Sequence, residues 1–566
     1  AYAFPAFFDS VTVIKGPQTV LHGPGNSGGV VLFEKDAPRF DRPGASLDGE
    51  LTFGSSARND QIIRATAGNG QFYAGADLVR SESDDYKDGD GNAVHSAYQR
   101  EGARMVAGWT PDADTRLEIS SALSQGEAAY AHSMMDATKL DRTNLGVRFE
   151  KKNLSTVVKR IELQSYYNHS DHVMDNYLLR TFTPSMMMPN PAAANVDYTL
   201  YGGRLLGELA ANENLQITVG TSFQLGTHRG RSTSDATANS YKDFPWETDA
   251  KINDYGVFLE ATQKLSEENR LVAGLRLDYW TAKDERPTIS TMMGTSANPT
   301  AGQDRDEALK SVFLRYEHDL ADLPATAYIG LGYTERAPDY WEMFSYGSTG
   351  SISGFHLAKE KPLQLDLGAR YQNGPLNLFA SVFANHTSDY ILVQEGYPVG
   401  MGMTRDVTRN VDAWLWGGEI GGGFSFAENW KLEASLACTR GRNSSDGTDL
   451  AQIPPLEGKI GLSYATPVWS VGALARFVAA QDRYALNQGS IIGTDLGPTG
   501  GFAVFSLHAG WNISEQATLF AGIDNLFDKT YAEHVSRAGS GDPAYAASVR
   551  TNEPGRTYWT KLQFRF

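Results

Sequence analysis

Cysteine, long apolar runs and a leader sequence are scarce or missing in this chain of 566 residues. The single cysteine, Cys438, excludes an intrachain disulfide. No stretch approaches 18 consecutive apolar residues, which excludes a transmembrane helix. No signal peptide opens the sequence, and because a secreted protein needs one, we expect the numbering to begin inside a mature protein.

An excess of positive charge is also lacking. The chain has 50 Lys and Arg against 67 Asp and Glu, a formal net charge of −17. Nucleic-acid binding requires a basic face, so the charge argues against it. An acidic exterior raises the local concentration of cations, although solubility alone explains the same charge equally well.

Catalytic motifs do not stand out. The 11 histidines are scattered, and neither His-Glu-x-x-His nor Cys-x-x-Cys occurs. The run Asp88-Gly-Asp-Gly-Asn92 is similar to the start of a calcium loop, but it lacks the terminal Glu of that loop. We therefore interpret it as a turn in an extracellular loop and predict that the chain is not an enzyme.

Alternation of apolar and polar residues with a period of two is the dominant pattern. It recurs over about ten residues at a time, for example in 271–280, 364–372 and 503–511. In the first of these segments one face carries Leu271, Ala273, Leu275, Leu277 and Tyr279. Because a soluble β-sandwich alternates too, the spacing of the turns must decide between the two folds.

Short and long connections alternate between these segments. Tight polar turns are predicted at 111–114, 211–214, 265–269, 320–324, 373–375, 427–429 and 513–516, and long connections include 169–198, 227–254, 281–310 and 527–554. Short turns at one rim and long loops at the other are typical of bacterial outer-membrane barrels. Counting from Leu47 to Phe566, the pattern predicts an all-β fold, a 22-stranded antiparallel transmembrane β-barrel over residues 46–566.

The two ends of the chain differ from the barrel pattern in informative ways. The last strand places Tyr558, Leu562, Phe564 and Phe566 on one face and ends in Phe, which is similar to the terminal signature of outer-membrane proteins. A 22-stranded barrel is wide enough to need a plug. Residues 1–45 precede the first strand, and within them 11–33 is a strand, a Gly/Pro turn, a short helix-like piece and another strand.

Two sequence motifs, one in the N-terminal segment and one at the penultimate strand, resemble motifs of a single protein family. The segment 11–33 resembles the plug of TonB-dependent receptors, with matches at Lys15, Gly16, Pro17, Gly23, Gly28 and Gly29 and with His22 in place of the usual Tyr. The run Asp524-Asn-Leu-Phe-Asp-Lys-Thr-Tyr531 resembles the "N-L-F-D-x-x-Y" of the same family. The resemblance covers the whole chain and implies import through the outer membrane of a Gram-negative bacterium.

The family resemblance also implies a longer plug than the sequence contains. Plugs of this family are longer than 45 residues, and a TonB-binding segment lies at their N-terminus. We therefore expect residues 1–45 to be only the C-terminal part of a plug domain, with the coupling segment absent.

Methionine is the informative residue type. By the predicted strand pattern, all twelve methionines except Met105 fall in the long loops, which make up less than half of the chain. Thioether sulfur selects soft metals, above all Cu(I). Methionine also fills gaps between apolar surfaces, so packing of the loops over the barrel mouth is the alternative interpretation.

Three clusters carry the metal hypothesis. In an extended backbone residues i and i+2 point the same way, so His172 and Met174 present an imidazole and a thioether to one point, the predicted primary half-site. The predicted secondary ligands are Met186, Met187 and Met188, together with His132, Met134 and Met135. Further loop methionines, Met292, Met293, Met401 and Met403, are expected to gather metal at the mouth.

The His-x-Met run resembles the copper-receptor branch of the family. In that branch the metal site joins a plug Cys-x-x-x-Met to a loop His-x-Met, and His172-Val173-Met174 matches the loop half. The resemblance implies that the plug half would lie before Ala1. Cys438 is not a candidate for the missing thiolate, because its parity with Leu432 and Leu436 predicts the lipid face.

The leading hypothesis is therefore a copper importer of the outer membrane. A siderophore or haem receptor of the same fold is the alternative, for which Tyr340, Trp341 and Tyr346 are candidate residues, and a surface or adhesion barrel without transport is a third. The expected partners are the TonB energy-transducing complex, outer-membrane lipid and lipopolysaccharide. We expect a monomer with no organic cofactor.

Overall fold

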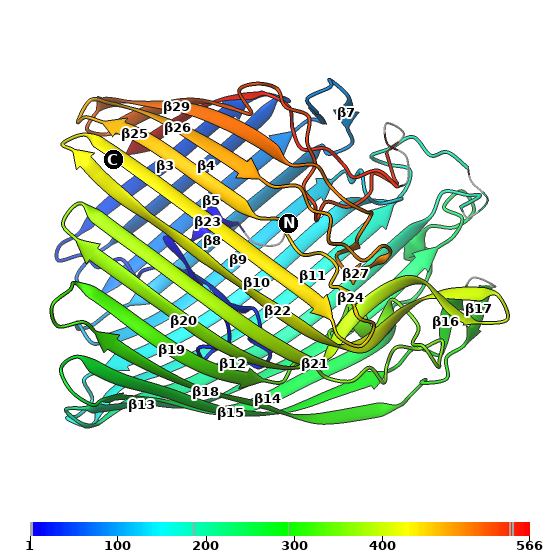
Figure 1. The fold of residues 1–566 in the computed structure, drawn as a ribbon, viewed down its shortest axis with the longest axis horizontal. Coiled ribbons are helices and arrows are strands. Elements are labelled where there is room, and N and C mark those ends of the chain that lie inside the picture. The colour runs from blue at the N-terminus through cyan, green and yellow to red at the C-terminus, as the bar shows by residue number, and fades with distance from the viewer. Residues whose placement is uncertain (1–3, 185, 187, 292–293, 543–544, 546–547) are drawn as a thin grey trace.

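The chain forms a closed antiparallel β-barrel of 22 long strands, as the sequence predicts. The computed structural model describes residues 4–184, 186, 188–291, 294–542, 545 and 548–566. Consecutive long strands pair along the ring, and β3 (Gly44–Gly54) pairs with β31 (Thr557–Arg565) to close it. Figure 1 shows the ring of tilted strands, with short turns at one rim and long loops at the other.

The remaining long strands follow in chain order. They are β4 (Arg58–Gly68), β5 (Phe72–Ser83), β8 (Tyr98–Trp109), β9 (Thr115–Ala128), β10 (Asp136–Lys152), β11 (Val158–Asp175), β12 (Ala193–Asn212), β13 (Leu215–Thr233), β14 (Glu247–Lys264), β15 (Asn269–Asp284), β18 (Asp304–Asp319), β19 (Ala325–Thr334), β20 (Lys361–Asn373), β21 (Leu376–Gly400), β22 (Met403–Ala427), β23 (Trp430–Asn443), β25 (Glu457–Ala465), β26 (Trp469–Val478), β29 (Phe502–Ser514) and β30 (Ala517–Asp524).

Short strands and helical pieces lie at the rim that carries the long loops. The small strands are β6 (Tyr86–Lys87), β7 (Ala93–Val94), β16 (Thr288–Thr291), β17 (Gly294–Ala297), β24 (Thr448–Asp449), β27 (Gln488–Ser490) and β28 (Gly493–Thr494). The helical pieces there are η2 (Tyr241–Asp243) and α1 (Tyr340–Phe344). None of the helices in the described ranges is long and apolar enough to cross a membrane.

All seven predicted tight turns are confirmed. The turn after β20, for example, is the pair Gly374-Pro375, and Gly374 takes the positive φ of 52° that a residue with a side chain rarely adopts. The predicted long connection 527–554 is confirmed between β30 and β31, but the other three are shorter than predicted because strands extend into them. For example, β11 runs to Asp175 rather than ending before 169. Above the lipid, the hydrogen-bond ladder persists although the apolar alternation that marks a strand in sequence has faded.

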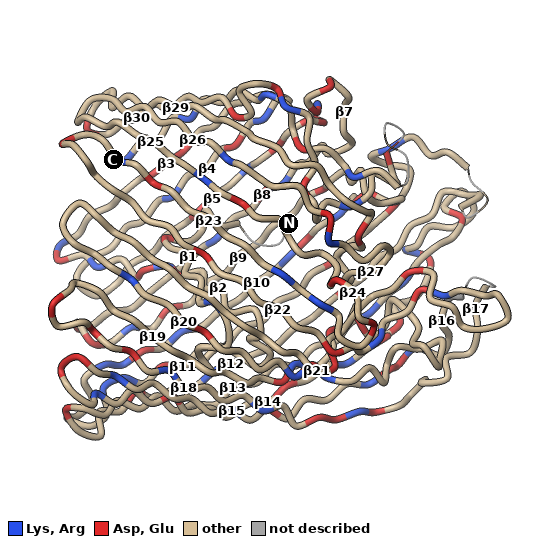
Figure 2. The backbone as a smooth tube through the Cα atoms, in the orientation of Figure 1, with Lys and Arg blue, Asp and Glu red and all other residues tan. Residues whose placement is uncertain are grey.

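Exposure identifies the two faces of the wall. On β15, Leu275, Leu277 and Tyr279 are 59%, 50% and 52% exposed, whereas Arg276 and Asp278 between them are buried. The exposed apolar side chains face outward toward lipid, and the buried charged ones face the lumen. Charged residues of both signs lie along the wall as well as at the rims (Figure 2).

The N-terminal segment lies inside the barrel. It comprises η1 (Pro5–Phe7) and the hairpin of β1 (Ser10–Lys15) with β2 (Gly29–Glu34), drawn dark blue in Figure 1. Its Phe4 and Phe7 pack against Val79 of the wall. Gly332 of β19 lets the segment approach closely, since an added Cβ there would lie 2.5 Å from the carbonyl oxygen of Pro17.

Candidate metal-binding site

The predicted primary pair lies at the loop-side end of a barrel strand, not in a loop. Both His172 and Met174 belong to β11 and are paired on either side, His172 with Leu140 and Val196. The placement in a loop was wrong, because the strand continues through the residues. A strand holds the two side chains in a fixed register that a loop would not impose.

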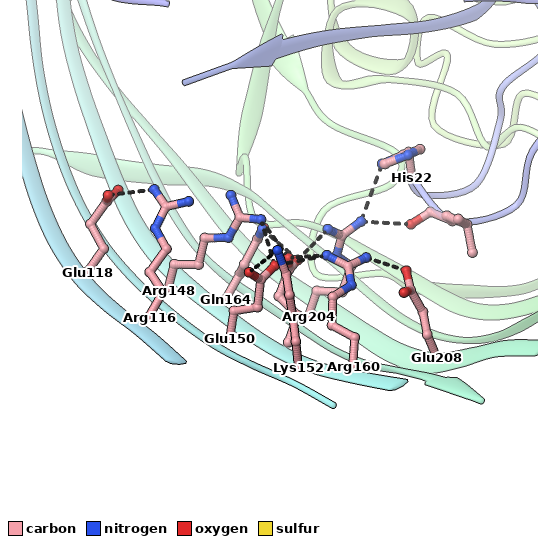
Figure 3. Close-up of polar contacts among 12 residues, drawn as sticks. His22, Arg116, Glu118, Arg148, Glu150, Lys152, Arg160, Gln164, Arg204 and Glu208 are labelled. Atoms are coloured by element: carbon pink, nitrogen blue, oxygen red, sulfur yellow. Dashed lines mark hydrogen bonds and ion pairs between the residues drawn. The ribbon is translucent and has the colours of Figure 1, made fainter. Parts of the chain in front are cut away.

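The face of this pair follows from contacts lower on the same strand. Glu162 accepts a hydrogen bond from Nη2 of Arg204 (3.0 Å), and Nη1 of Arg204 lies 3.3 Å from Nδ1 of His22 in the N-terminal segment. Figure 3 shows Arg204 reaching from the wall to His22. Even-numbered positions of β11 therefore face the lumen, and the ladder to β12 is regular from Arg160 to Asp175.

His172 and Met174 thus share the lumen face, as the i, i+2 spacing predicts. Their cross-strand neighbours are apolar: Leu140 and Val196 beside His172, and Ala137 and Ala194 beside Met174. An imidazole and a thioether among aliphatic neighbours make a soft, uncharged pair of donors. Such a pair suits Cu(I), for which few ligands suffice.

The cluster around His132 lies in the connection between β9 and β10. Met134 is 45% exposed, and His132 packs against Tyr130 with ring centroids 5.3 Å apart. Burial, reinforced by the charges of Arg537 and Arg180, lowers the pKa of His132 to about 4. The imidazole is therefore neutral near pH 7, the form in which histidine binds metal.

The third cluster lies in the connection between β11 and β12. Met186 is fully exposed, and Nδ2 of Asn176 donates to the sulfur of Met188 at 3.5 Å. Met187, Met292 and Met293 lie outside the described residues. No contact that joins this cluster or that of His132 to the primary pair is established for the described residues, so their convergence remains a prediction.

The other methionines divide between exposure and packing. Met401 and Met403, at the tip of the β21–β22 hairpin, are 94% and 53% exposed. Met343 in α1 is fully buried with Trp280, Leu309 and Phe355, so loop packing is the correct interpretation for that residue. Met105 lies in a strand, β8, as expected, and its exposed side chain faces lipid. Within the described ranges, no three His, Cys, Asp or Glu side chains are grouped to hold a metal ion.

Charged lumen residues hold the N-terminal segment, and sequence reasoning did not single them out. Guanidinium groups from three strands donate to backbone carbonyls of the segment 18–21: Arg204 to Leu21 (3.3 Å), Arg276 to Val20 (3.4 Å) and Arg315 to Gln18 (3.4 Å). Glu260 accepts from the hydroxyl of Thr19 (3.0 Å) and the amide of Val20 (3.3 Å). Their inward parity was the available signal, since a charge facing the lumen needs a partner there.

His22 stands where the family motif has tyrosine. Burial and then the charge of Arg204 lower the pKa of His22 to about 4, so the ring is neutral. Because the guanidinium supplies the proton of the contact, Nδ1 of His22 is the acceptor. His22 therefore contributes to holding the segment in the barrel.

Four loops meet above the mouth at a set of three residues, the loop clasp, formed by His95, Asp136 and Arg180. Asp136 is fully buried and accepts from Nε of Arg180 (2.8 Å) and the amide of Tyr130 (2.9 Å), and Nε2 of His95 lies 2.9 Å from it. Arg180 also donates to the carbonyl of Gly541 (3.0 Å). The clasp ties the loops that carry two of the methionine clusters.

Two other predicted features are placed by the structure. The carboxylate of Asp88 accepts from the amides of Asp90 (3.0 Å) and Asn92 (2.9 Å), so this run is the turn that the sequence analysis favours. Cys438 pairs with Gly418 and keeps the parity of Leu432 and Leu436, whose exposure of 37% and 47% marks the lipid face.

The aromatic residues considered for a siderophore are partly engaged. The hydroxyl of Tyr340 donates to Asp249 (2.7 Å), and its ring stacks on His228 with centroids 3.8 Å apart. Trp341 beside them is 49% exposed. These contacts hold α1 against the wall. Of the three candidates Tyr340, Trp341 and Tyr346, Trp341 is the one with an exposed side chain.

Comparisons with known proteins agree on the fold. A model of the TonB dependent receptor-like β-barrel family matches residues 76–526. The copper transporter OprC is 43% identical, with a TM-score of 0.96 over 100% of this chain and 87% of that chain. The FrpB iron transporter of Neisseria meningitidis is 15% identical, with a TM-score of 0.73 over 98% of this chain and 88% of that one, a likeness of fold alone.

Among curated proteins, the pesticin receptor of Yersinia enterocolitica is similar along nearly the whole chain. It is 21% identical over 574 residues, which cover 96% of this chain and 80% of that receptor. Relatives with different named ligands therefore share this architecture, and the ligand must be argued from the site.

Proposed function

The chain belongs to the TonB-dependent receptor family of outer-membrane β-barrels, and from this premise we propose that it imports copper across the outer membrane of a Gram-negative bacterium. One observation carries the proposal: His172 and Met174 lie on the lumen face of β11 among aliphatic neighbours. The similarity to a copper transporter at 43% identity supports the same cargo.

The oxidation state that these donors favour is Cu(I). Thioether and imidazole ligands suit this soft ion, and two to four of them suffice. Four exposed residues gain little from packing, which supports their role as secondary contacts at the mouth: Met134, Met186, Met401 and Met403. His132, Met135, Met187 and Met188 complete the proposed secondary set.

Residues 1–45 form part of a plug in this proposal, and 46–566 form the barrel. The described part of the segment is held inside the ring by the arginine contacts from β12, β15 and β18. Its hairpin exposes Val11, Val13, Val31 and Phe33 on one side at 50%, 58%, 54% and 41%. A one-sided apolar face is typical of a sheet that packs against further plug structure.

Membership of the family implies a TonB partner that supplies energy to move the plug. Transport requires the contacts between the plug and the wall to break, since they occupy the lumen. Lipopolysaccharide is the proposed neighbour of the outward face, and a monomer is the proposed assembly, because closure leaves no sheet edge to pair with a second copy.

We assign no catalytic role to the chain. The run Gly25-Asn-Ser-Gly-Gly29 matches the letters of a nucleophile elbow, in which the serine lies between a strand and a helix. Here strand β2 follows, and the amide of Ser27 donates to the carbonyl of Gly25 (2.8 Å) in a tight turn.

The test is copper stoichiometry in the receptor purified from its native outer membrane. Met174→Leu keeps apolar volume and should cost under about 1.5 kcal/mol of stability, yet it removes the sulfur. We expect Met174→Leu and His172→Ala to lose copper, whereas Met105→Leu on the lipid face retains it. Undiminished copper in both site variants would leave only a receptor of unassigned cargo.

A further inference from the structure

Behind the primary pair, on the outer side of the wall, lies a buried side-chain amide. Asn195 of β12 is 1% exposed and pairs across the strands with Val173, the residue between His172 and Met174. Its Nδ2 donates to the carboxylate of Asp171 (2.6 Å) and to the backbone carbonyl of His172 (3.1 Å). One N–H of the amide is thus bonded to the backbone of His172 itself, and the other to the side chain of Asp171 beside it.

The oxygen of the same amide is engaged from the other side. Oδ1 of Asn195 accepts a hydrogen bond from Nε of Arg231 on β13 at 2.9 Å. The guanidinium of Arg231 lies over the ring of Trp246 at 4.3 Å and near that of Tyr241 at 5.4 Å. Asp171 receives a second donor, Nζ of Lys139 on β10, at 2.5 Å.

Residues 234–246 cover this network. The η2 turn in that connection lies against β13 and β12, and the amide of Ala236 donates to the carbonyl of Pro191 (2.7 Å). The cover explains how polar groups on the outward side of the wall come to be buried. A buried amide whose two N–H groups and whose oxygen are all engaged fixes its neighbours, because leaving a partner unsatisfied costs about 1–3 kcal/mol.

We propose that Asn195 is the positioning residue of the copper half-site. It joins the carboxylate of Asp171 and the backbone carbonyl of His172 on β11 to Arg231 on β13. In this way it holds the imidazole and the thioether in register on the opposite face of β11. Groups behind metal ligands commonly set the orientation of those ligands. The proposal rests on the proposed function, since it assigns Asn195 to the site formed by His172 and Met174.

Two substitutions of Asn195 separate packing from hydrogen bonding. Asn195→Ala removes the amide, and Asn195→Asp keeps the volume and the acceptor for Arg231 but cannot donate when ionised. We expect both to lower Cu(I) affinity about tenfold in the receptor from its native membrane. Asn443→Ala is the matched control, a fully buried asparagine at the loop-side end of β23 that hydrogen-bonds Asp446 instead.

A second readout excludes mere loss of folded protein. X-ray absorption at the copper edge distinguishes nitrogen from sulfur scatterers, and we expect fewer nitrogens per copper in both variants. Partial unfolding would reduce bound copper without changing that ratio. Arg231→Gln, which breaks the network while leaving Asn195 in place, supplies the measurement if the Asn195 variants do not fold, with a smaller loss expected.

The outcomes separate the two proposals. If Met174→Leu and His172→Ala both retain copper, the proposed function fails. If His172→Ala loses copper while every folded Asn195 or Arg231 variant keeps the parent affinity and absorption spectrum, the positioning role is overturned and the copper site stands.

Discussion

Methionine side chains take two contrasting environments in this receptor. Met343 is sealed in an apolar cluster, where a flexible thioether fills space. Met186 and Met401 project almost wholly into solvent, where a sulfur gains nothing from packing but remains available to a soft cation. Residue type alone did not separate these roles, because burial depends on how the loops fold.

Cys438 supplies a test of strand phase at a single residue. It shares the outward parity of Leu432 and Leu436, so its thiol faces away from the lumen. We expect Cys438→Ala to leave copper stoichiometry unchanged when the purified variant is assayed beside the parent. A clear loss of copper would mean that β23 has the opposite phase.

The parity of His172 and Met174 was predictable because it depends only on the period of an extended chain. The contacts that Asn195 makes behind these two residues could not be predicted from the sequence. Asn195 lies 36 residues from Arg231 and 23 residues from His172 in the sequence, and it reaches them only through the register of β12 with β13 and with β11. Register is set by the whole ladder of hydrogen bonds between the strands, and no local sequence pattern around Asn195 predicts it.

Strand ends differ in how well the sequence marks them. Most predicted turns at the short-turn rim contain Gly, Pro, Asn or Asp, which interrupt the ladder within a few residues. At the other rim β11 continues to Asp175 and β21 to Gly400, although lipid no longer imposes apolar alternation there. The hydrophobic pattern therefore marks the membrane crossing and not the length of the strand.

The loop clasp makes a prediction about pH. The hydrogen bond to Asp136 is the largest cause that raises the pKa of His95 above its ordinary value of 6.5. A raised pKa stabilises the clasp fully below pH 6.5 and loses that contribution as the pH rises through the raised value. We expect protease cleavage between β7 and β8 to quicken from pH 6 to pH 9.

The matched variant is His95→Gln, which has no proton to lose in this range. Its cleavage should change little with pH, apart from the dependence of the protease itself measured on an unfolded substrate. Equal pH dependence in parent and variant would show that the clasp does not respond to the charge of His95.

Contact between plug and wall predicts the effect of one methyl group. In Gly332→Ala, the added Cβ would meet the ring and carbonyl of Pro17 at 2.5 Å, an overpacking that costs typically 1–3 kcal/mol. We expect faster proteolysis of residues 4–45 in membrane vesicles. In the control Gly207→Ala, the added Cβ would lie 3.9 Å from its nearest neighbour, the carbonyl oxygen of Arg160. Proteolysis of residues 4–45 in this control should match that in the parent. Equal rates in both variants would contradict the close approach.

At the scale of the whole molecule, the fold was the most predictable property. Twenty-two strands follow from alternating connection lengths, and closure follows from the need to satisfy every backbone hydrogen bond in lipid. The charged contacts that hold the N-terminal segment lie inside that ring, between residues far apart in sequence, such as Arg276 and Val20. They become visible only once the barrel has closed around the segment.

Accumulation of radioactive copper by whole cells tests copper import most directly. Cells that carry the receptor, the His172→Ala variant or no receptor are compared at limiting copper, each with and without the inner-membrane TonB system. We predict accumulation that needs both the receptor and TonB and falls in His172→Ala to the level of cells without receptor. Equal copper accumulation with and without the receptor would contradict copper import.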